Sequence, residues 1–281
     1  MTEFLDIKGG PRIAYDVTGE GPLVVLSHGI GDHRQAFRFL VPELAGAGFR
    51  VAAADMRGHG ESSIGDWKSI SRTDVAGDLV ALVRHLGGGP AVIVGHSLSG
   101  GAATIAAATA PDLVGGVVEI GPFTRKVQYS LGGLVRIRRY RRGTMAMLGV
   151  MLLHSMRSWF RYLDVAYPEK PADYADYMAA LRAKLSEPGR MAEFLKTTMK
   201  SSPADAGAAL PRISCPALVV MGTEDPDWAD PRAEAEGIVA EMPAGLGRIA
   251  MIKGAGHYPH AQCPDEVAVL TTSFIRNRVL A

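Results

Sequence analysis

The sequence predicts an α/β fold with a mostly parallel central sheet flanked by helices. Short apolar runs, such as residues 23–29, alternate with segments whose apolar side chains recur at helical spacing, such as residues 73–86. This alternation indicates parallel strands, because a crossover helix returns the chain to the start of each next strand. The alternation stops at Pro122 and resumes at Ala217, which indicates one domain with a long insertion.

Each element of the predicted domain is read from its apolar pattern, in chain order. In the first half the expected strands are 23–29, 49–56, 91–97 and 113–121. The expected helices between them are 34–47, 73–86 and the alanine-rich 101–110. After the insertion the pattern predicts strands 217–225 and 247–257 and helices 231–241 and 264–279.

The insertion, residues 122–210, shows only helical segments and is too long for an ordinary connection. It follows the carboxyl end of a strand, where open α/β sheets bind ligands. We therefore expect a helical lid over residues 122–210 and a core domain made of residues 1–121 and 211–281.

Composition and charge exclude several classes of protein. The chain has 281 residues, of which 47% are hydrophobic, and its formal net charge is +1. This balance gives no reason to expect a nucleic acid or an anionic membrane as partner, so we expect a small-molecule substrate. The oligomeric state stays open.

The sequence also bears on the compartment. Cys215 and Cys263 are too few for a disulfide framework, and no basic segment followed by an apolar one marks the N-terminus. The most apolar stretch outside the strands, residues 145–154, is about half the length needed to span a bilayer. We expect a cytoplasmic protein without a membrane span.

The stretch VGHSLSGG, residues 94–101, places two serines between a buried strand and an alanine-rich helix. A nucleophilic serine on a sharp strand-to-helix turn needs small residues two positions before and after it. Gly95 and Ser99 are those flanks for Ser97, which stands at the break itself. Ser99 falls in the first helical turn, so we predict Ser97 as the nucleophile and Ser99 as a flank or cap.

Three further motifs accompany this turn, and together the four resemble the α/β-hydrolase superfamily over nearly the whole chain. They are SHGIGDH (residues 27–33), DMRGHGESS (55–63), VVMGTEDPDW (219–228) and GAGHYPH (254–260). Their order is the order of this family, in which serine, acid and histidine follow one another along the chain.

The resemblance implies an α/β-hydrolase fold with the helical lid inserted after the sixth strand. It implies a catalytic triad of Ser97, Asp225 and His257. It also implies an oxyanion hole made by the backbone N–H groups of Ile30 and Leu98. No metal and no cofactor belong to this machinery.

The residues leave alternatives for the acid and the base. Asp227 and Asp230 lie close to Asp225 in sequence, and Glu119 ends the strand before the insertion. His260 is an alternative to His257 as the base, but Pro259 lies between them and argues against a shared helical face. The two histidines are not expected to bind a metal, because the sequence pattern places no third ligand near them.

Two departures from the family pattern bear on the activity. Ser99 stands where many members have glycine, which keeps the flank small. No aspartate replaces Ser97, which argues against the epoxide-hydrolase and haloalkane-dehalogenase branches, whose nucleophile is a carboxylate.

The insertion is rich in aromatic residues and methionine, which favours an apolar or aromatic substrate. We expect Phe123, Trp159, Tyr162 and Tyr258 to contact it. The basic run at residues 136–142 is interpreted as a solvated helix face, a site for an anionic substrate tail such as a CoA phosphate, or a partner-binding patch.

The predicted function is that of a serine hydrolase that cleaves a carboxylic ester, thioester or lactone through an acyl-enzyme. The triad does not exclude a ligand receptor or signalling protein that keeps an intact triad. It also does not exclude a cofactor-free perhydrolase or a biosynthetic cyclase.

Overall fold

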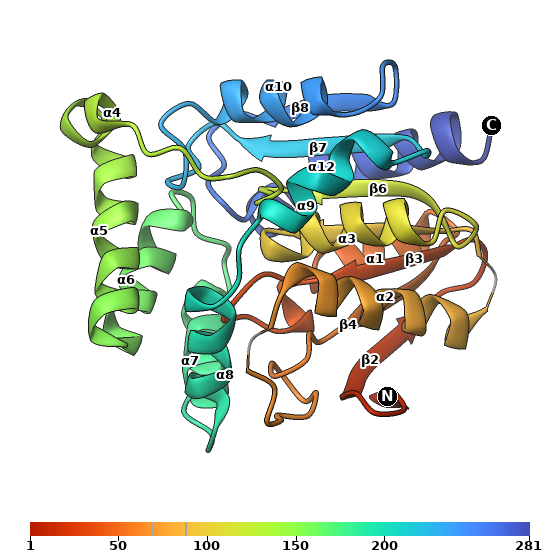
Figure 1. The fold of residues 1–281 in the computed structure, drawn as a ribbon, viewed down its shortest axis with the longest axis horizontal. Helices are drawn as coiled ribbons and strands as arrows, with labels where there is room; N and C mark the ends of the chain where they lie inside the picture. Colours follow the sequence, from red (N-terminus) through yellow and green to blue (C-terminus); the bar gives the residue numbers. More distant parts are fainter. Residues whose placement is uncertain (69, 88) are drawn as a thin grey trace.

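The computed structural model describes residues 1–68, 70–87 and 89–281 and is built around one eight-stranded sheet (Figure 1). The strand order is β1-β2-β4-β3-β5-β6-β7-β8. Strands β3 to β8 run parallel to one another, whereas β1 and β2 pair in antiparallel fashion at one edge. The strands are β1 Glu3–Asp6, β2 Arg12–Thr18, β3 Leu23–Ser27, β4 Arg50–Ala54, β5 Ala91–His96, β6 Val114–Ile120, β7 Ala217–Gly222 and β8 Gly247–Ile252.

The two faces of the sheet are covered by different helices. Apolar residues of α2 (Arg72–Leu86), α3 (Leu98–Thr109) and α10 (Pro231–Glu241) form one core cluster with the sheet. On the opposite face, α1 (Leu40–Gly46) and α12 (Pro264–Phe274) bury their apolar sides in a second cluster. This three-layer arrangement confirms the predicted α/β fold and its mostly parallel sheet.

The expected helix 34–47 is two shorter elements. A 3-10 helix spans Arg34–Phe37, and α1 begins at Leu40. Pro42 has no N–H to donate to the carbonyl of Arg38, so one continuous α-helix through this segment is disfavoured. At the C-terminus, the expected helix 264–279 consists of α12 and a π-helical turn at Ile275–Val279.

Six helices lie between β6 and β7, and most of them lie beyond the carboxyl ends of the parallel strands (Figure 1). They are α4 Leu131–Arg136, α5 Arg138–Leu153, α6 Met156–Ala166, α7 Tyr174–Leu185, α8 Arg190–Met199 and α9 Ala204–Ala209. A third apolar cluster, which includes Trp159, Leu181, Phe194 and Tyr258, packs α6, α7 and α8 against the loop after β8.

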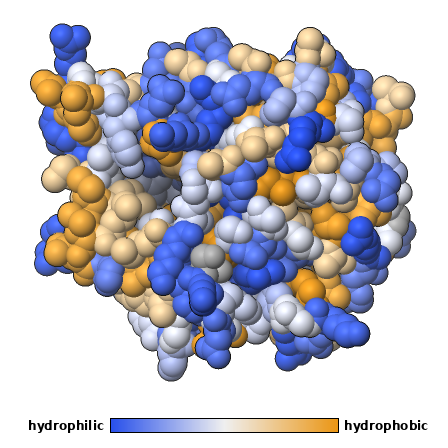
Figure 2. All heavy atoms as spheres, in the orientation of Figure 1, coloured by the Kyte–Doolittle hydropathy of each residue, from blue (hydrophilic) through white to orange (hydrophobic). Residues whose placement is uncertain are grey.

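Apolar side chains are also exposed along α4 and α5, at the left of Figure 2. Leu131, Val135, Leu152 and Leu153 each expose three quarters or more of their surface. In the described part of the chain, no helix combines the length and apolarity needed to cross a bilayer.

Candidate active site

Ser97 stands at the junction of β5 and α3 in a strained backbone conformation, with φ 56° and ψ −117°. A positive φ at a residue other than glycine needs support from its surroundings. That support is close packing: a Cβ atom at Gly95 would lie 2.1 Å from the carbonyl oxygen of Ser99, and one at Gly29 would lie 2.8 Å from Cβ of Ser97. Only glycine fits at these two positions while the turn keeps its shape.

Ser99 is directed into the core. Its hydroxyl is fully buried and donates to the carbonyl of His28 at 2.6 Å, with Ser27 Oγ 2.9 Å away. Ser97 instead lines two adjoining cavities, so its hydroxyl is the accessible one.

His257 lies beside two carboxylates. Its Nδ1 is 2.9 Å from Asp225 Oδ2 and 3.2 Å from Asp227 Oδ2. Asp225 is fully buried, and its Oδ1 accepts a hydrogen bond from the backbone N–H of Asp227 at 3.0 Å. Burial alone would lower the pKa of His257, but Asp225 and Asp227 together raise it to about 9.

Asp227 is connected to the inserted helices. The hydroxyl of Tyr162, on α6, donates to Asp227 Oδ2 at 2.6 Å. Burial, opposed by His257 and reinforced by Asp225, raises the pKa of Asp227 to about 6. Tyr162 also stacks on Trp159, with ring centroids 5.2 Å apart. Tyr162, which is 65 positions from Asp227 in the sequence, therefore hydrogen-bonds a carboxylate that faces His257.

The other candidate acids, Asp230 and Glu119, hydrogen-bond groups other than His257. Asp230 is the N-cap of α10, where Oδ1 accepts from the N–H of Ala233 at 3.1 Å. Glu119 is buried within the sheet and hydrogen-bonds Thr104, and burial raises its pKa to about 8.

His260 is fully buried between Phe37 and His96, and neither ring nitrogen has a partner among the described residues. Burial lowers the pKa of His260 to about 3. Without a carboxylate to orient it, His260 has a packing role.

The backbone N–H groups of Ile30 and Leu98 are the expected oxyanion donors. Leu98 is the first residue of α3, so its N–H has no acceptor within the helix. Ile30 N–H donates no hydrogen bond within the described ranges, and both residues line the cavity that Ser97 lines.

No hydrogen bond joins Ser97 Oγ to His257 in the part of the chain that the structure describes, but both residues line a cavity of about 40 Å³. Phe123, Trp159, Tyr162 and Tyr258 line the same small cavity, so the four expected substrate contacts surround the serine and histidine.

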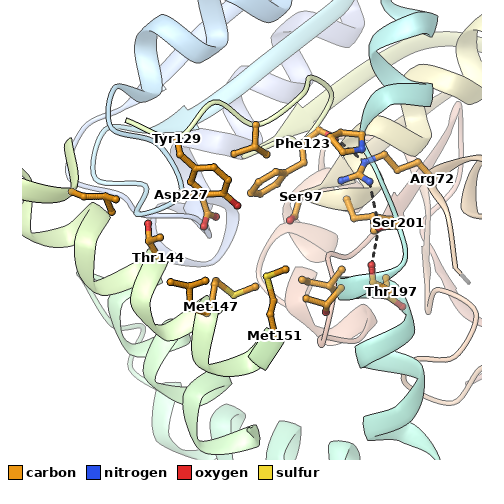
Figure 3. A pocket seen from close by; sticks show the side chains of 17 residues that line it. Arg72, Ser97, Phe123, Tyr129, Thr144, Met147, Met151, Thr197, Ser201 and Asp227 are labelled. Atoms are coloured by element: carbon orange, nitrogen blue, oxygen red, sulfur yellow. Dashed lines mark hydrogen bonds between the residues drawn. The ribbon is translucent and has the colours of Figure 1, made fainter. Parts of the chain in front are cut away.

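Ser97 also lines a larger cavity of about 500 Å³ (Figure 3). Its wall is mainly apolar, and Met147, Leu148 and Met151 of α5 contribute to it. Of the four expected contacts, only Phe123 lines this larger space.

Asp225, Asp227 and His257 also form a group with the composition of a metal site, since their ligand atoms lie within 4.8 Å of one another. Hydrogen bonds already use the atoms that would face an ion, because Asp227 Oδ2 accepts from Tyr162 and Asp225 Oδ2 faces His257 Nδ1. The donor set fits an oriented histidine better than a bound cation.

Comparison with known proteins gives the family. A profile of the alpha/beta hydrolase family matches residues 24–270, most of the chain. The chain belongs to the α/β-hydrolase family. It is a hydrolase of this fold.

Individual relatives of this α/β-hydrolase differ in activity. The 2-(acetamidomethylene)succinate hydrolase of Mesorhizobium japonicum is 29% identical, over 92% of this chain and 89% of that protein. Epoxide hydrolase B of Mycobacterium tuberculosis is 39% identical, over 41% of this chain and 33% of that protein. The structure of a thermophilic esterase from Thermogutta terrifontis is 25% identical and superposes with a TM-score of 0.71, covering 99% and 98% of the two chains.

Sequence reasoning missed two neighbours of Ser97 in this hydrolase. His96 is buried, its pKa is well below its ordinary value because of burial, and its Nε2–H donates to the carbonyl of His257 at 2.9 Å. This bond fixes the backbone of the histidine loop relative to the serine turn. The sequence did contain a signal for His96, because this histidine directly precedes Ser97 within residues 94–101. Arg72 is the second neighbour, and nothing in its helical setting marked it.

The basic run is largely a helix surface. Arg139 differs from its neighbours, because it contacts Glu224 at 3.2 Å and donates to the carbonyl of Trp228 at 3.0 Å. It thereby connects α5 to the loop that carries Asp225 and Asp227.

Proposed function

We propose that this hydrolase cleaves a carboxylic ester, thioester or lactone bond of a small, largely apolar or aromatic substrate through an acyl-enzyme. One observation carries the proposal. Ser97, held at a strained turn, shares a cavity with His257, whose Nδ1 is oriented by a buried carboxylate, Asp225. A serine hydroxyl needs such a base, because it is a weak nucleophile on its own.

The proposed reaction follows from this placement. His257 Nε2 takes the proton of Ser97 Oγ while that oxygen attacks the carbonyl carbon, and Asp225 stabilises the imidazolium that forms. The N–H groups of Ile30 and Leu98 donate to the oxyanion. His257 then protonates the leaving oxygen or sulfur, and water, activated by the same histidine, releases the acid from Ser97.

We further propose that residues 122–210 act as the lid of a core made of residues 1–121 and 211–281. Support comes from the helices between β6 and β7, which supply Trp159 and Tyr162 to the small cavity and Met147 to both cavities. Apolar walls of this kind suit an apolar or aromatic substrate.

A panel of 4-nitrophenyl esters, thioesters and lactones tests the proposal. We expect rapid multiple turnover that is lost in Ser97→Ala and retained in Ser99→Ala. A single slow turnover would favour a ligand receptor instead.

The epoxide hydrolases among the relatives provide a second measurement. Styrene oxide hydrolysis that persists in Ser97→Ala, together with inert esters, would contradict the proposed serine mechanism. We expect no epoxide turnover. In the epoxide-hydrolase branch of the family the nucleophile is a carboxylate, whereas this chain has the hydroxyl of Ser97 at that position.

A further inference from the structure

Arg72 is a buried cation in the wall of the larger cavity. It is the first residue of α2, it is 5% exposed, and it lines the same space as Ser97. Its Nε donates to the carbonyl of Phe123 at 2.8 Å, and its Nη1 lies 3.5 Å from Ser201 Oγ. Figure 3 shows the guanidinium beside Phe123 and Ser201, on the side of the cavity next to Ser97.

Among the described residues, no carboxylate pairs with this guanidinium. Within residues 1–68, 70–87 and 89–281, no acidic oxygen lies within 4.0 Å of Arg72. Asp205 is near enough to act on Arg72 electrostatically, but it accepts the hydroxyl of Thr73 at 2.7 Å.

Other buried and half-buried arginines of the core are paired. Arg34 contacts Asp16 at 2.6 Å and also meets Asp55 and Glu61. Arg57 contacts Asp78 at 2.6 Å. An unpaired charge in an apolar wall is unfavourable, so a buried arginine without an acid needs an anion from elsewhere.

Arg72 remains charged in its burial. Desolvation lowers the pKa of its guanidinium to about 10, with Asp205 acting in the opposite direction. At neutral pH the group is therefore a cation that faces a cavity of about 500 Å³ with otherwise mainly apolar walls.

We propose that Arg72 binds a carboxylate of the substrate, which makes the substrate an ester, thioester or lactone with a second, acidic group. This inference rests on the proposed function and names the substrate class of that site. A planar carboxylate matches the fork of guanidinium donors. Ser201 Oγ accepts from Nη1 of Arg72 at 3.5 Å and donates its own proton to the carbonyl of Thr197 at 2.7 Å, so the guanidinium supplies the donors to the substrate.

The negative charge of Asp227 sets the orientation of the substrate in the larger cavity. Asp227 and Arg72 lie on either side of Ser97 in Figure 3, and both line the larger cavity. A substrate carboxylate is repelled by Asp227 and attracted by Arg72. The acidic end therefore lies toward α2, and the bond to be cleaved lies at Ser97.

Binding of a non-hydrolysable pair tests the inference without turnover. We would measure 4-phenylbutanoate and 4-phenylbutanamide by calorimetry on the full chain, on Arg72→Gln and on Arg84→Gln. Arg84 is an exposed arginine of the same helix and serves as the matched control. We expect the acid to bind the wild type about 10- to 100-fold more tightly than the amide, with the preference lost only in Arg72→Gln.

Kinetics supply the second readout. Mono-4-nitrophenyl adipate is compared with 4-nitrophenyl hexanoate, and 4-butyryloxybenzoate with 4-butyryloxybenzamide, so that the carboxylate is on the acyl or the alcohol side. For the preferred acid, Arg72→Gln should lower kcat/KM about 10- to 100-fold through KM and change the neutral ester less than about threefold. Arg72→Lys should recover part of the loss.

The outcomes separate the two proposals. Binding that prefers the acid through Arg72, with no ester turned over, leaves this inference standing and contradicts the proposed function alone. Equal binding of acid and amide by the wild type overturns the inference. An equal loss on acid and neutral esters in Arg72→Gln also overturns it, because Arg72 would then only support the loop at Phe123. If Arg72→Gln does not fold, Arg72→Lys and the wild-type comparison decide.

Discussion

Two serines two residues apart have opposite environments, and this difference can be measured. Ser97 Oγ faces a cavity, whereas Ser99 Oγ donates to the carbonyl of His28 inside the core. A fluorophosphonate probe should therefore label the wild type and Ser99→Ala but not Ser97→Ala. Loss of the buried hydrogen bond should cost Ser99→Ala about 1–2 kcal/mol of unfolding free energy. Labelling that survives in Ser97→Ala would assign the nucleophile elsewhere.

Asp225 and Asp227 both face His257 Nδ1, at 2.9 Å and 3.2 Å, but their roles should differ. Asp225 is fully buried, whereas Asp227 accepts the hydroxyl of Tyr162 and lines the cavities. We expect Asp225→Asn to lower kcat by about 10³-fold or more and Asp227→Asn to lower it far less. The reverse order would identify Asp227 as the triad acid.

The same pair of variants has a pH signature. His257 must be neutral to accept the proton of Ser97, and its pKa is raised to about 9, so kcat/KM should rise as pH approaches that value. Asp227→Asn removes one of the two negative charges that favour the imidazolium, so the rising limb should move to lower pH. Asp230→Asn, which alters only the cap of α10, should leave the limb in place.

Sequence reasoning reached Ser97 and His257 because each stands in a motif at the end of a strand. The family resemblance put Asp225 ahead of Asp227, but the residues alone left both open, because no periodicity fixes the direction of two side chains this close in a loop. The bond from Tyr162 to Asp227 joins residues 65 positions apart, so only the fold could reveal it.

At the scale of elements, α5 has two sides with different consequences. Met147 lines both cavities, whereas Met145 is 60% exposed and lines neither. Met147→Ala should enlarge the apolar space and shift the preferred ester toward longer acyl chains. The discrimination between esters that differ by one methylene should change by roughly 1–3 kcal/mol. Met145→Ala is the matched control and should leave the preference unchanged.

This experiment is evaluated as ratios of kcat/KM across 4-nitrophenyl acetate, butyrate, hexanoate and octanoate. Probe labelling of Ser97 should stay intact in both variants. An unchanged ratio in Met147→Ala would remove α5 from substrate selection and weaken the proposal that residues 122–210 form a lid.

Elements with long buried patterns were predicted well, and the two outermost strands at one end of the sheet were not. Strand β6 and helix α10 lie within a residue of their expected bounds. Strands β1 and β2 were not predicted from the sequence. Three of the four residues of β1 are exposed, and only three consecutive residues of β2 are buried. An edge strand needs no continuous apolar run.

For the molecule as a whole, Glu119 provides a pH-dependent contribution to stability. Burial raises its pKa from 4.5 to about 8, so the folded chain holds the proton more tightly than the unfolded chain. The stability from this proton is complete below about pH 4 and is lost as pH rises toward 8. Glu119→Gln cannot ionise, so its advantage over the wild type should grow with pH to a few kcal/mol, on the order of 3.

Urea unfolding at pH 5, 7 and 9 measures this difference. Glu43→Gln, an exposed carboxylate on α1, is the control and should unfold with the wild-type pH dependence. A Glu119→Gln curve parallel to the wild type across this range would show that the carboxyl does not change its ionisation on folding.

The contrast between a crowded turn and an accessible helix also determines where new specificities can arise. Gly29 and Gly95 leave no room for a methyl group, and a Cβ at Gly121 would lie 3.0 Å from Nδ1 of His257. On α5, Met147 is half-buried and Leu148 and Met151 are exposed, so larger or smaller side chains fit there without disturbing the serine turn. In a directed-evolution library made from this hydrolase, surviving substitutions should accumulate on α5, while the three glycines stay invariant under any selection that requires activity.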